Sequence, residues 1–345
     1  ERLIDRRLET DAYGERWGRH WLDVAGYADS EGYTTEDRER PWAYHYRDWV
    51  IRSLRDDKPI DRFILEQLAG DELFAGDLNE PDPASLDPLI ATGFLRTAAD
   101  GTGQGGVGEP LARNQSIADT IKIVSTSLLG VSMACAQCHD HRYDPILQED
   151  YFRLRAILAP ALDADAWQSP PQRLVSLYTS ADRAAAAAVE AEAAAVAEER
   201  RVKEEGFLAA ALDKELGKYD EPLKSQLRDA YRTAAGERTA EQQALLDSNP
   251  SVNISPGVLY QYDQAAADEL KTYDAKIAEI RSRKPVERFL SVVREPAGHL
   301  PETKVFHRGD YRQPTTTVVP GDLSVLEFDG ARLDLPLDDP TLPTS

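Results

Sequence analysis

Basic residues are in the minority in this chain, which has 40 Lys and Arg against 61 Asp and Glu and a formal net charge of −21. This balance argues against nucleic acid as a partner, because a phosphate backbone needs a basic binding surface. Binding to an anionic membrane surface is disfavoured for the same reason. The sequence also lacks a long hydrophobic run, so it predicts no membrane span.

Cysteine is scarcer still. Cys135 and Cys138 are the only two in the chain, and His139 follows them directly. C-x-x-C-H is the attachment pattern of covalent haem c. The two thiols add across the haem vinyl groups, and the adjacent imidazole becomes the proximal iron ligand. The sequence therefore predicts a c-type haem held by Cys135, Cys138 and His139.

Three other interpretations of this cysteine pair stay open. A local Cys135–Cys138 disulfide would be expected between a strand and a helix, and the sequence shows no such context. A zinc site that includes His139 and His141 would ordinarily draw ligands from a second segment, which is not apparent. Free thiols are the third interpretation, and an exposed pair of them is unusual in an oxidising compartment.

The single methionine, Met133, limits the kind of haem site. It is tethered two residues before Cys135 and cannot reach the far side of the porphyrin, so a His/Met electron carrier is not expected. A bis-histidine site or a five-coordinate open iron remains. His20 is the candidate distal ligand, in a predicted helix over residues 11–29 whose apolar stripe is Tyr13, Trp17, His20, Val24 and Tyr27. The competing interpretation is a hydrogen-bonded core histidine.

The pattern of apolar and helix-forming residues predicts a mainly α fold in three parts. Residues 1–160 are expected to form a compact helical haem domain, since four of the five tryptophans lie in the first 50 residues. Residues 161–284 are rich in Ala, Glu, Lys and Arg, which predicts a long helical hairpin or small bundle that acts as a spacer or docking arm. Residues 285–345 regain prolines and β-branched residues, which predicts short strands and extended segments.

Several finer expectations concern individual helices. One helix is predicted to begin at Ser116 and to end near Gly130, just before the cysteine motif. Another is predicted to start at Pro222, and a last one to span residues 259–283. The glycine-rich stretch 99–108 is interpreted as a loop, since it lacks the GK[ST] ending of a phosphate loop.

Acidic residues cluster after the motif. They are typical of a turn that is followed by a helix start at Asp144-Pro145. They also suit hydrogen bonds to the proximal imidazole or the haem propionates, which would tune the potential of the iron. EF-hand spacing is lacking, and no catalytic triad or glycosidase carboxylate pair can be picked out. The residues concerned are Asp140, His141, Asp144 and Asp150.

Several separated blocks resemble the planctomycete cytochrome-like domain family of unknown function. They include E-R-W-G-R-H-W-L-D-V at 15–24, Y-R-D-W-V at 46–50, E-Q-L-A-G-D at 66–71 and C-A-Q-C-H-D-H-R-Y-D-P at 135–145. The resemblance covers about residues 1–160. It implies an exported protein, periplasmic, secreted or on the cell surface, in which Cys135, Cys138 and His139 hold haem. A segment near residues 308–321 resembles the lead into a second domain, which this chain lacks.

The function expected from these features is extracytoplasmic electron transfer, or part of a haem-dependent oxidoreductase. A redox partner protein is implied, and the resemblance adds carbohydrate-processing enzymes and polysaccharide breakdown as a context. Two alternatives stay open. One is a non-haem binding or scaffold module in which the cysteines form a local disulfide. The other is a peroxidase-like enzyme with an open iron site.

Overall fold

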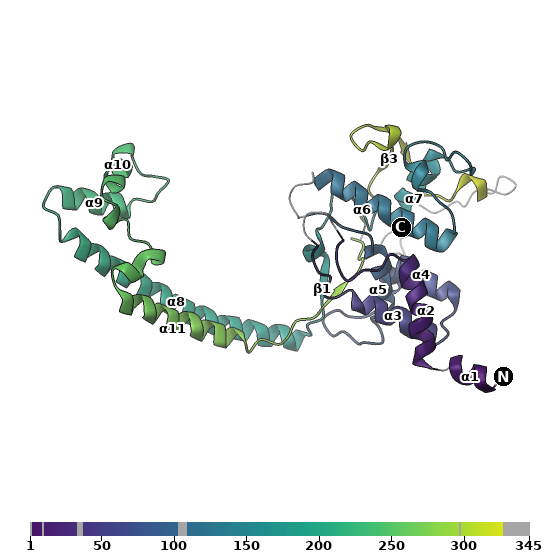
Figure 1. The fold of residues 1–345 in the computed structure, drawn as a ribbon, viewed down its shortest axis with the longest axis horizontal. Helices are drawn as coiled ribbons and strands as arrows, with labels where there is room; N and C mark the ends of the chain where they lie inside the picture. The colour runs from purple at the N-terminus through teal and green to yellow at the C-terminus, as the bar shows by residue number, and fades with distance from the viewer. Residues whose placement is uncertain (1, 9, 33–36, 103–108, 297, 327–345) are drawn as a thin grey trace. The chain divides into compact units, whose positions relative to one another are not determined.

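The structure is a computed structural model that describes residues 2–8, 10–32, 37–102, 109–296 and 298–326. It is mainly helical, which confirms the predicted fold class, and has two small antiparallel sheets (Figure 1). The chain forms two compact units. Unit 1 consists of residues 1–179 and 287–345, and unit 2 consists of residues 180–286. The division into three domains stays a prediction. In the structure, the segment from residue 287 onward is part of unit 1.

Unit 1 contains most of the elements. Its α-helices are α1 (Arg2–Leu8), α2 (Asp11–Val24), α3 (Tyr44–Arg55), α4 (Ile60–Leu73), α5 (Asp87–Ala91), α6 (Glu109–Val124) and α7 (Gln148–Leu158). Its shorter helical turns are η1 (Thr92–Arg96), η2 (Ser125–Leu129), η3 (Ala134–Gln137), η4 (Pro170–Arg173), η7 (His307–Gly309) and η8 (Ser324–Leu326). Its strands are β1 (Leu174–Ser176), β2 (Phe289–Ser291), β3 (Thr303–Phe306) and β4 (Pro314–Val318).

Helix α2 packs on α3 through glycines, and not through the predicted aromatic stripe. Gly14 and Gly18 are buried, whereas Trp17 is 52% exposed and His20 is also exposed. A methyl group at residue 14 would lie 2.6 Å from the Ile51 carbonyl oxygen, so only glycine permits this approach. The prediction that His20 lies on a buried apolar face is therefore wrong, because the contact is made by the smallest residues of the helix.

Helix α2 also ends earlier than predicted. Its last residue is Val24, and Gly26 has a φ of +67°, a left-handed conformation that glycine adopts without strain. The chain turns there, so Tyr27 lies outside the helix.

The core of unit 1 is aromatic. Trp49 and Phe63 stack with their ring centroids 5.0 Å apart, and both are buried. The Trp21 indole N–H donates to the Gln67 side-chain oxygen at 3.0 Å, and the Tyr46 hydroxyl donates to the same atom at 2.6 Å. These bonds satisfy the polar edges of rings whose faces are buried, which is the usual condition for burying Trp and Tyr.

Helix α6 begins at Glu109, seven residues before the predicted start. Ser116 lies inside the helix, so it is not an N-cap, and its hydroxyl-bearing side chain is buried. Its buried face includes Ile117, Ile121 and Val124. After the short π-helical turn η2, Gly130 adopts a φ of +67° and ends the helix as predicted. Most of the glycine-rich stretch, residues 103–108, lies outside the described residues.

The segment after residue 286 completes the core of unit 1. Strand β2 pairs with β1, with Leu290 opposite Val175. Leu290, Val292 and Val293 are buried in the same cluster as the helices. The Val293 N–H donates to the Thr92 hydroxyl at 2.9 Å, which fixes the segment against η1. Strands β3 and β4 form an antiparallel pair that packs on α7.

Unit 2 is a helical hairpin with a small helical cluster at its turn. Helix α8 (Ser180–Leu216) and helix α11 (Gln264–Arg281) lie side by side (Figure 1). Their ion pairs run in opposite order along the two helices, so the hairpin is antiparallel, as predicted. These pairs are Glu190–Arg281 (2.7 Å), Arg200–Asp274 (2.7 Å) and Lys203–Glu269 (2.8 Å).

Apolar residues of α11 form the seam of the hairpin. Leu270, Ile277 and Ile280 are buried and Tyr273 is partly buried. Helix α11 begins at Gln264, five residues after the predicted start, because the Asp263 side chain accepts a hydrogen bond from the Ala266 N–H and caps the helix there. The connecting elements are α9 (Leu223–Arg232), α10 (Ala240–Ser248), η5 (Pro250–Val252) and η6 (Pro256–Gln261).

The close crossing of α2 and α3 predicts a sharp effect of Gly14→Ala. The added methyl group would overlap the Ile51 carbonyl, so we expect the free energy of unfolding of unit 1 to fall by about 1–3 kcal/mol. Gly206→Ala in α8 is the matched control, because nothing lies within 4 Å of the added group. Helix propensity should make that variant more stable by about 0.5–1 kcal/mol. Chemical denaturation measures both, and equal effects would contradict the proposed packing.

Candidate haem-attachment site

The cysteine motif lies on a short turn that is anchored in the core of unit 1 by buried residues. Met133 is fully buried in the core of unit 1, and so is Ala136, between the two cysteines. The 3-10 turn η3 follows, in which the Cys138 N–H donates to the Cys135 carbonyl at 3.3 Å. Met133 thus anchors the turn in the core, two residues before Cys135. This position agrees with its exclusion as a distal ligand.

Both thiols are available for chemistry. Cys135 and Cys138 are exposed and not bonded to each other. His139 is also exposed, and its Nδ1 lies 2.7 Å from the Asp140 carbonyl oxygen. A carbonyl oxygen can only accept, so this contact assigns the ring proton to Nδ1 and leaves the Nε2 lone pair free. In metal sites, a hydrogen bond from the ring nitrogen that does not bind the metal fixes the orientation of the ligating histidine.

These features fit a covalent haem. One turn presents two thiols and an imidazole with a free Nε2, and the chain on either side of the motif exposes large apolar side chains. Leu129 is 48% exposed, Tyr143 84% and Leu147 44%. These side chains would be available for contact with a haem attached at the motif.

The C-terminal segment packs directly against Cys138. A methyl group at Gly309, in the turn η7 between β3 and β4, would lie 2.6 Å from the Cys138 Sγ. The Gln148 side-chain amide donates to the Gln137 carbonyl at 3.1 Å and to the Phe306 carbonyl at 3.0 Å. Gln148 therefore joins the motif, the start of α7 and the end of β3.

The acidic residues after the motif act mainly on the backbone. The Asp140 carboxylate accepts a hydrogen bond from the Gln148 N–H at 2.8 Å, and Asp150 accepts from the Leu147 N–H at 2.9 Å. These bonds satisfy N–H groups at the start of α7, which begins at Gln148 and not at Asp144-Pro145 as predicted. Asp140 contacts the His139 imidazole through its carbonyl, not its carboxylate.

His141 is held as a structural residue in this turn. Its Nδ1 accepts a hydrogen bond from the Asp144 N–H at 2.9 Å. The Asp144 carboxylate lies 3.2 Å from the same nitrogen. Because a nitrogen that accepts from an amide carries no proton of its own, that second contact is not a hydrogen bond.

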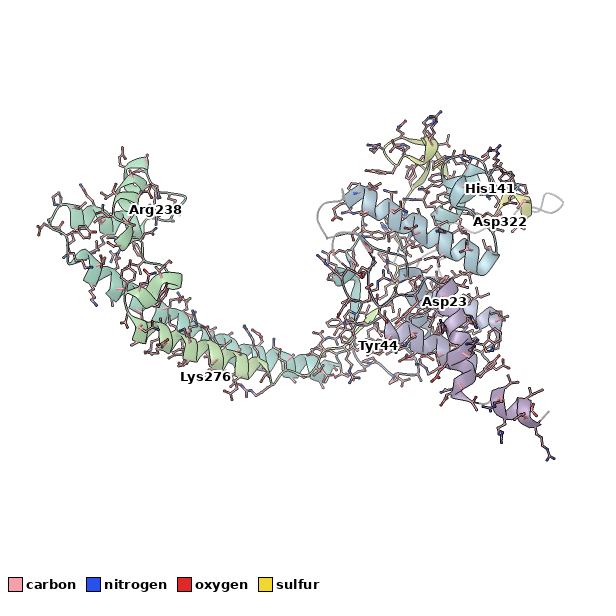
Figure 2. All side chains as sticks on the ribbon, in the orientation of Figure 1. Asp23, Tyr44, His141, Arg238, Lys276 and Asp322 are labelled. Atoms are coloured by element: carbon pink, nitrogen blue, oxygen red, sulfur yellow. The ribbon has the colours of Figure 1, made fainter. Side chains whose placement is uncertain are left out.

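His20 is placed away from this arrangement. It lies on α2, where its ring makes an edge contact with Trp17 at a centroid distance of 5.6 Å. Asp23, one turn after His20, is well separated from His141 in Figure 2. The structure thus brings Cys135, Cys138 and His139 together without His20, whose role as a distal ligand stays a prediction.

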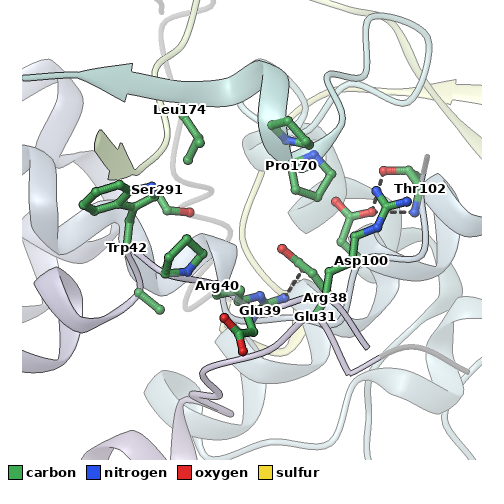
Figure 3. A pocket seen from close by; sticks show the side chains of 13 residues that line it. Glu31, Arg38, Glu39, Arg40, Trp42, Asp100, Thr102, Pro170, Leu174 and Ser291 are labelled. Atoms are coloured by element: carbon green, nitrogen blue, oxygen red, sulfur yellow. Dashed lines mark hydrogen bonds and ion pairs between the residues drawn. The ribbon is translucent and has the colours of Figure 1, made fainter. Parts of the chain in front are cut away.

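A second feature of unit 1 is a cavity of about 220 Å³ (Figure 3). Trp42, Leu174 and prolines from two loops form its apolar walls. Arg40 lies beside it and pairs with Glu31 at 2.7 Å, both side chains being 8% exposed. No motif in the sequence predicts this cavity, because its residues come from five separated segments between Glu31 and Ser291.

Two further results concern the residues that the structure describes. Within that part of the chain, no group of three or more His, Cys, Asp or Glu side chains is arranged to hold a metal ion, so the zinc interpretation of the cysteine pair gains no support. None of the described helices has the length and apolar character required to cross a bilayer.

Comparison with protein families supports part of the resemblance. Residues 1–162 match the family PSCyt2, described as a protein of unknown function (DUF1549). The matched segment ends just after α7 and contains the whole cysteine motif. Searches of curated proteins and of solved structures found no match.

The contact between Gly309 and Cys138 predicts that Gly309→Ala lowers stability by clash as well as by strain. Gly298→Ala is the matched control, because both glycines have a positive φ (+74° and +69°) but nothing lies within 4 Å of the group added at residue 298. We expect Gly309→Ala to cost about 1–3 kcal/mol more than the control, since it overpacks the turn. Denaturant midpoints measure the difference. Equal losses of stability in the two variants would show that the turn does not pack closely against Cys138.

Proposed function

We propose that unit 1 carries a covalently attached haem c on Cys135 and Cys138, with His139 as the proximal ligand, and that it takes part in redox chemistry. The observation that carries this proposal is the arrangement of the motif. Two exposed thiols lie on one 3-10 turn, and the Asp140 carbonyl holds the adjacent imidazole by Nδ1. When bound, the haem would supply one-electron chemistry or an open iron site.

The surrounding residues would keep this turn in one geometry. Buried Met133 and Ala136 fix its inner side, and Gln148 ties it to β3. Tyr151 and Phe152 of α7 are buried nearby in the same core, and burial raises the pKa of Tyr151, so its hydroxyl stays neutral. A rigid, largely apolar base under the motif limits reorganisation when charge moves, which suits electron transfer.

An extracytoplasmic location belongs to the same proposal, since thioether attachment of haem takes place outside the cytoplasm. A redox partner protein follows from the proposed chemistry. Carbohydrate-processing enzymes as partners are supported only by the resemblance of residues 1–160 to a planctomycete family. The acidic composition of the chain favours a partner with a basic surface.

The direct test is expression of the full chain with haem-maturation machinery, followed by an absorption spectrum after denaturation. We expect a Soret band that stays with the unfolded polypeptide at one haem per chain. In the double variant Cys135→Ser/Cys138→Ser the band should be lost on denaturation, because no thioether bond holds the haem. His20→Ala is the control and should retain the covalent band, since His20 is remote from the motif.

The spectrum also separates the alternatives. A folded, colourless protein whose mass shows a Cys135–Cys138 disulfide would refute the haem proposal and favour the binding or scaffold module. A covalent haem with a high-spin spectrum would favour ligand or peroxide chemistry, and a low-spin spectrum would favour electron transfer. A change of spin state in His20→Ala would identify His20 as the distal ligand.

A further inference from the structure

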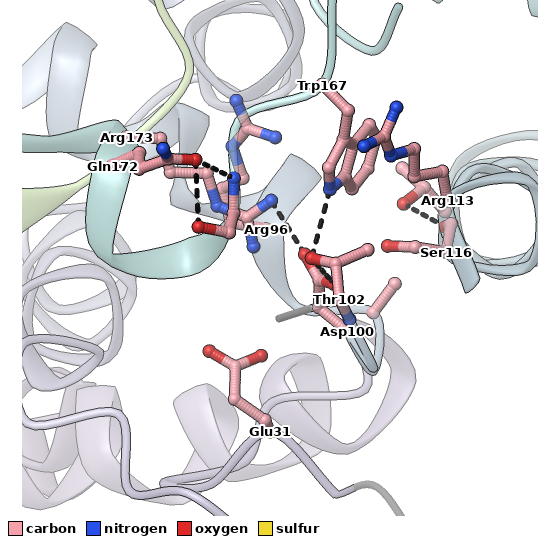
Figure 4. A network of polar contacts seen from close by, with 12 residues as sticks. Glu31, Arg96, Asp100, Thr102, Arg113, Ser116, Trp167, Gln172 and Arg173 are labelled. Atoms are coloured by element: carbon pink, nitrogen blue, oxygen red, sulfur yellow. Dashed lines mark hydrogen bonds and ion pairs between the residues drawn. The ribbon is translucent and has the colours of Figure 1, made fainter. Parts of the chain in front are cut away.

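Arg96, at the end of η1, is a partly buried cation, and the two carboxylates that act on it, Asp71 and Asp100, form no ion pair with it. Its Nε donates to the Val292 carbonyl at 3.3 Å, and no carboxylate oxygen of the described residues lies within 4.0 Å of its guanidinium. Burial, and then the nearby Arg173, lower the pKa of Arg96 well below its usual value. Asp100 is close but already pairs with Arg173 at 2.9 Å (Figure 4). The Asp71 carboxylate also acts on Arg96, but it accepts a hydrogen bond from the Glu295 N–H at 2.9 Å and forms no ion pair with the guanidinium.

Arg96 borders a cavity of about 100 Å³ that a second arginine also lines. Arg294 is exposed at this cavity, and it too has no carboxylate within 4.0 Å among the described residues. Other arginines of unit 1, such as Arg16 on α2, also have no carboxylate partner among the described residues, but Arg96 and Arg294 line the same cavity. Elsewhere in unit 1, Arg40, Arg52 and Arg55 all have carboxylate partners.

The remaining walls define what fits between these arginines. Trp167 contributes an indole whose N–H is already donated to the Thr102 hydroxyl at 3.2 Å. Asp163 is the acidic residue of the lining, and it is held by the His299 Nε2 at 2.8 Å. The volume equals that of roughly three water molecules, so it admits a small polar head group and not a whole sugar or nucleotide.

We propose that this cavity, formed by Arg96, Arg294 and Trp167, is a binding site for an oxyanion. A guanidinium presents paired N–H donors that match the oxygens of a carboxylate, sulfate or phosphate group. An anion there would accept hydrogen bonds from the Arg96 guanidinium and, at the rim, from Arg294. The organic part of a larger anionic ligand would extend past Arg294 into solvent, with the Trp167 ring as its apolar contact.

This site is independent of the proposed haem. The cavity adjoins the C-terminal end of α7, whereas the cysteine motif adjoins its N-terminal end, about 16 Å away along the rise of 11 residues. Failure of the haem proposal therefore leaves the oxyanion proposal unchanged, and the reverse also holds.

The test is calorimetric titration of the full chain with sodium sulfate, sodium phosphate and sodium acetate. Sodium chloride at matched ionic strength is the reference. We expect saturable 1:1 binding of at least one oxyanion that chloride does not reproduce. Tighter binding of sulfate and phosphate would indicate a tetrahedral dianion as the ligand head group, and tighter binding of acetate would indicate a carboxylate.

The variants locate the binding. Arg294→Gln removes an exposed side chain and should weaken binding by about tenfold or more, the loss expected for a charged hydrogen bond. Arg16→Gln on α2 makes the same charge change at an exposed position outside the cavity and should leave the affinity unchanged. The proposal is overturned if no oxyanion binds beyond the chloride reference, or if Arg294→Gln and Arg16→Gln bind equally well.

Discussion

The pairing of β1 with β2 is the constraint on which the architecture of unit 1 depends. Three residues on each strand align, and the pairing returns the chain to the helices of residues 1–179 after more than 100 residues in unit 2. Closing so long a loop has an entropic cost. Burial of Leu290, Val292 and Val293 in the helical core, together with the Val293–Thr92 hydrogen bond, offsets it.

This return has a consequence for the cysteine motif. Once β2 is in place, the chain continues into β3, η7 and β4, which pack on α7 and bring Gly309 to Cys138. The matched family segment, residues 1–162, therefore contains the thiols and the imidazole but not all of the structure that supports them. Unit 2 is an insertion in sequence between two paired strands, a connection that leaves the core of unit 1 continuous.

Local signals in the sequence predict the start of α9, the end of the α6–η2 segment and the helical character of unit 2. The alanine-rich run of α8, Pro222 before α9 and Gly130 after η2 each act within a few residues, and the structure agrees with each of them. The cysteine motif is also a local signal, since the three residues that carry the proposed chemistry lie within five positions.

The error at α2 arose where long-range packing decides. The aromatic stripe of α2 suggested a buried face, but a helix that crosses another closely does so through its smallest residues, here Gly14 and Gly18. Because α2 contacts α3 through these glycines, His20 is exposed. Nor could spacing reveal that Arg96 and Arg294, almost 200 positions apart, line one cavity, because only the β1–β2 return brings their segments together.

The most direct test of this architecture is amide hydrogen exchange in Leu290→Ala, compared with Leu300→Ala, whose side chain is half exposed. Removing the fully buried Leu290 side chain should destabilise unit 1 by about 2–5 kcal/mol and speed exchange in α5, α7 and the cysteine turn together. Exchange in α8 and α11 should not change. Unaltered protection of α7 and the cysteine turn in Leu290→Ala would contradict the account, since it would mean that the helical unit holds the motif without the returning segment.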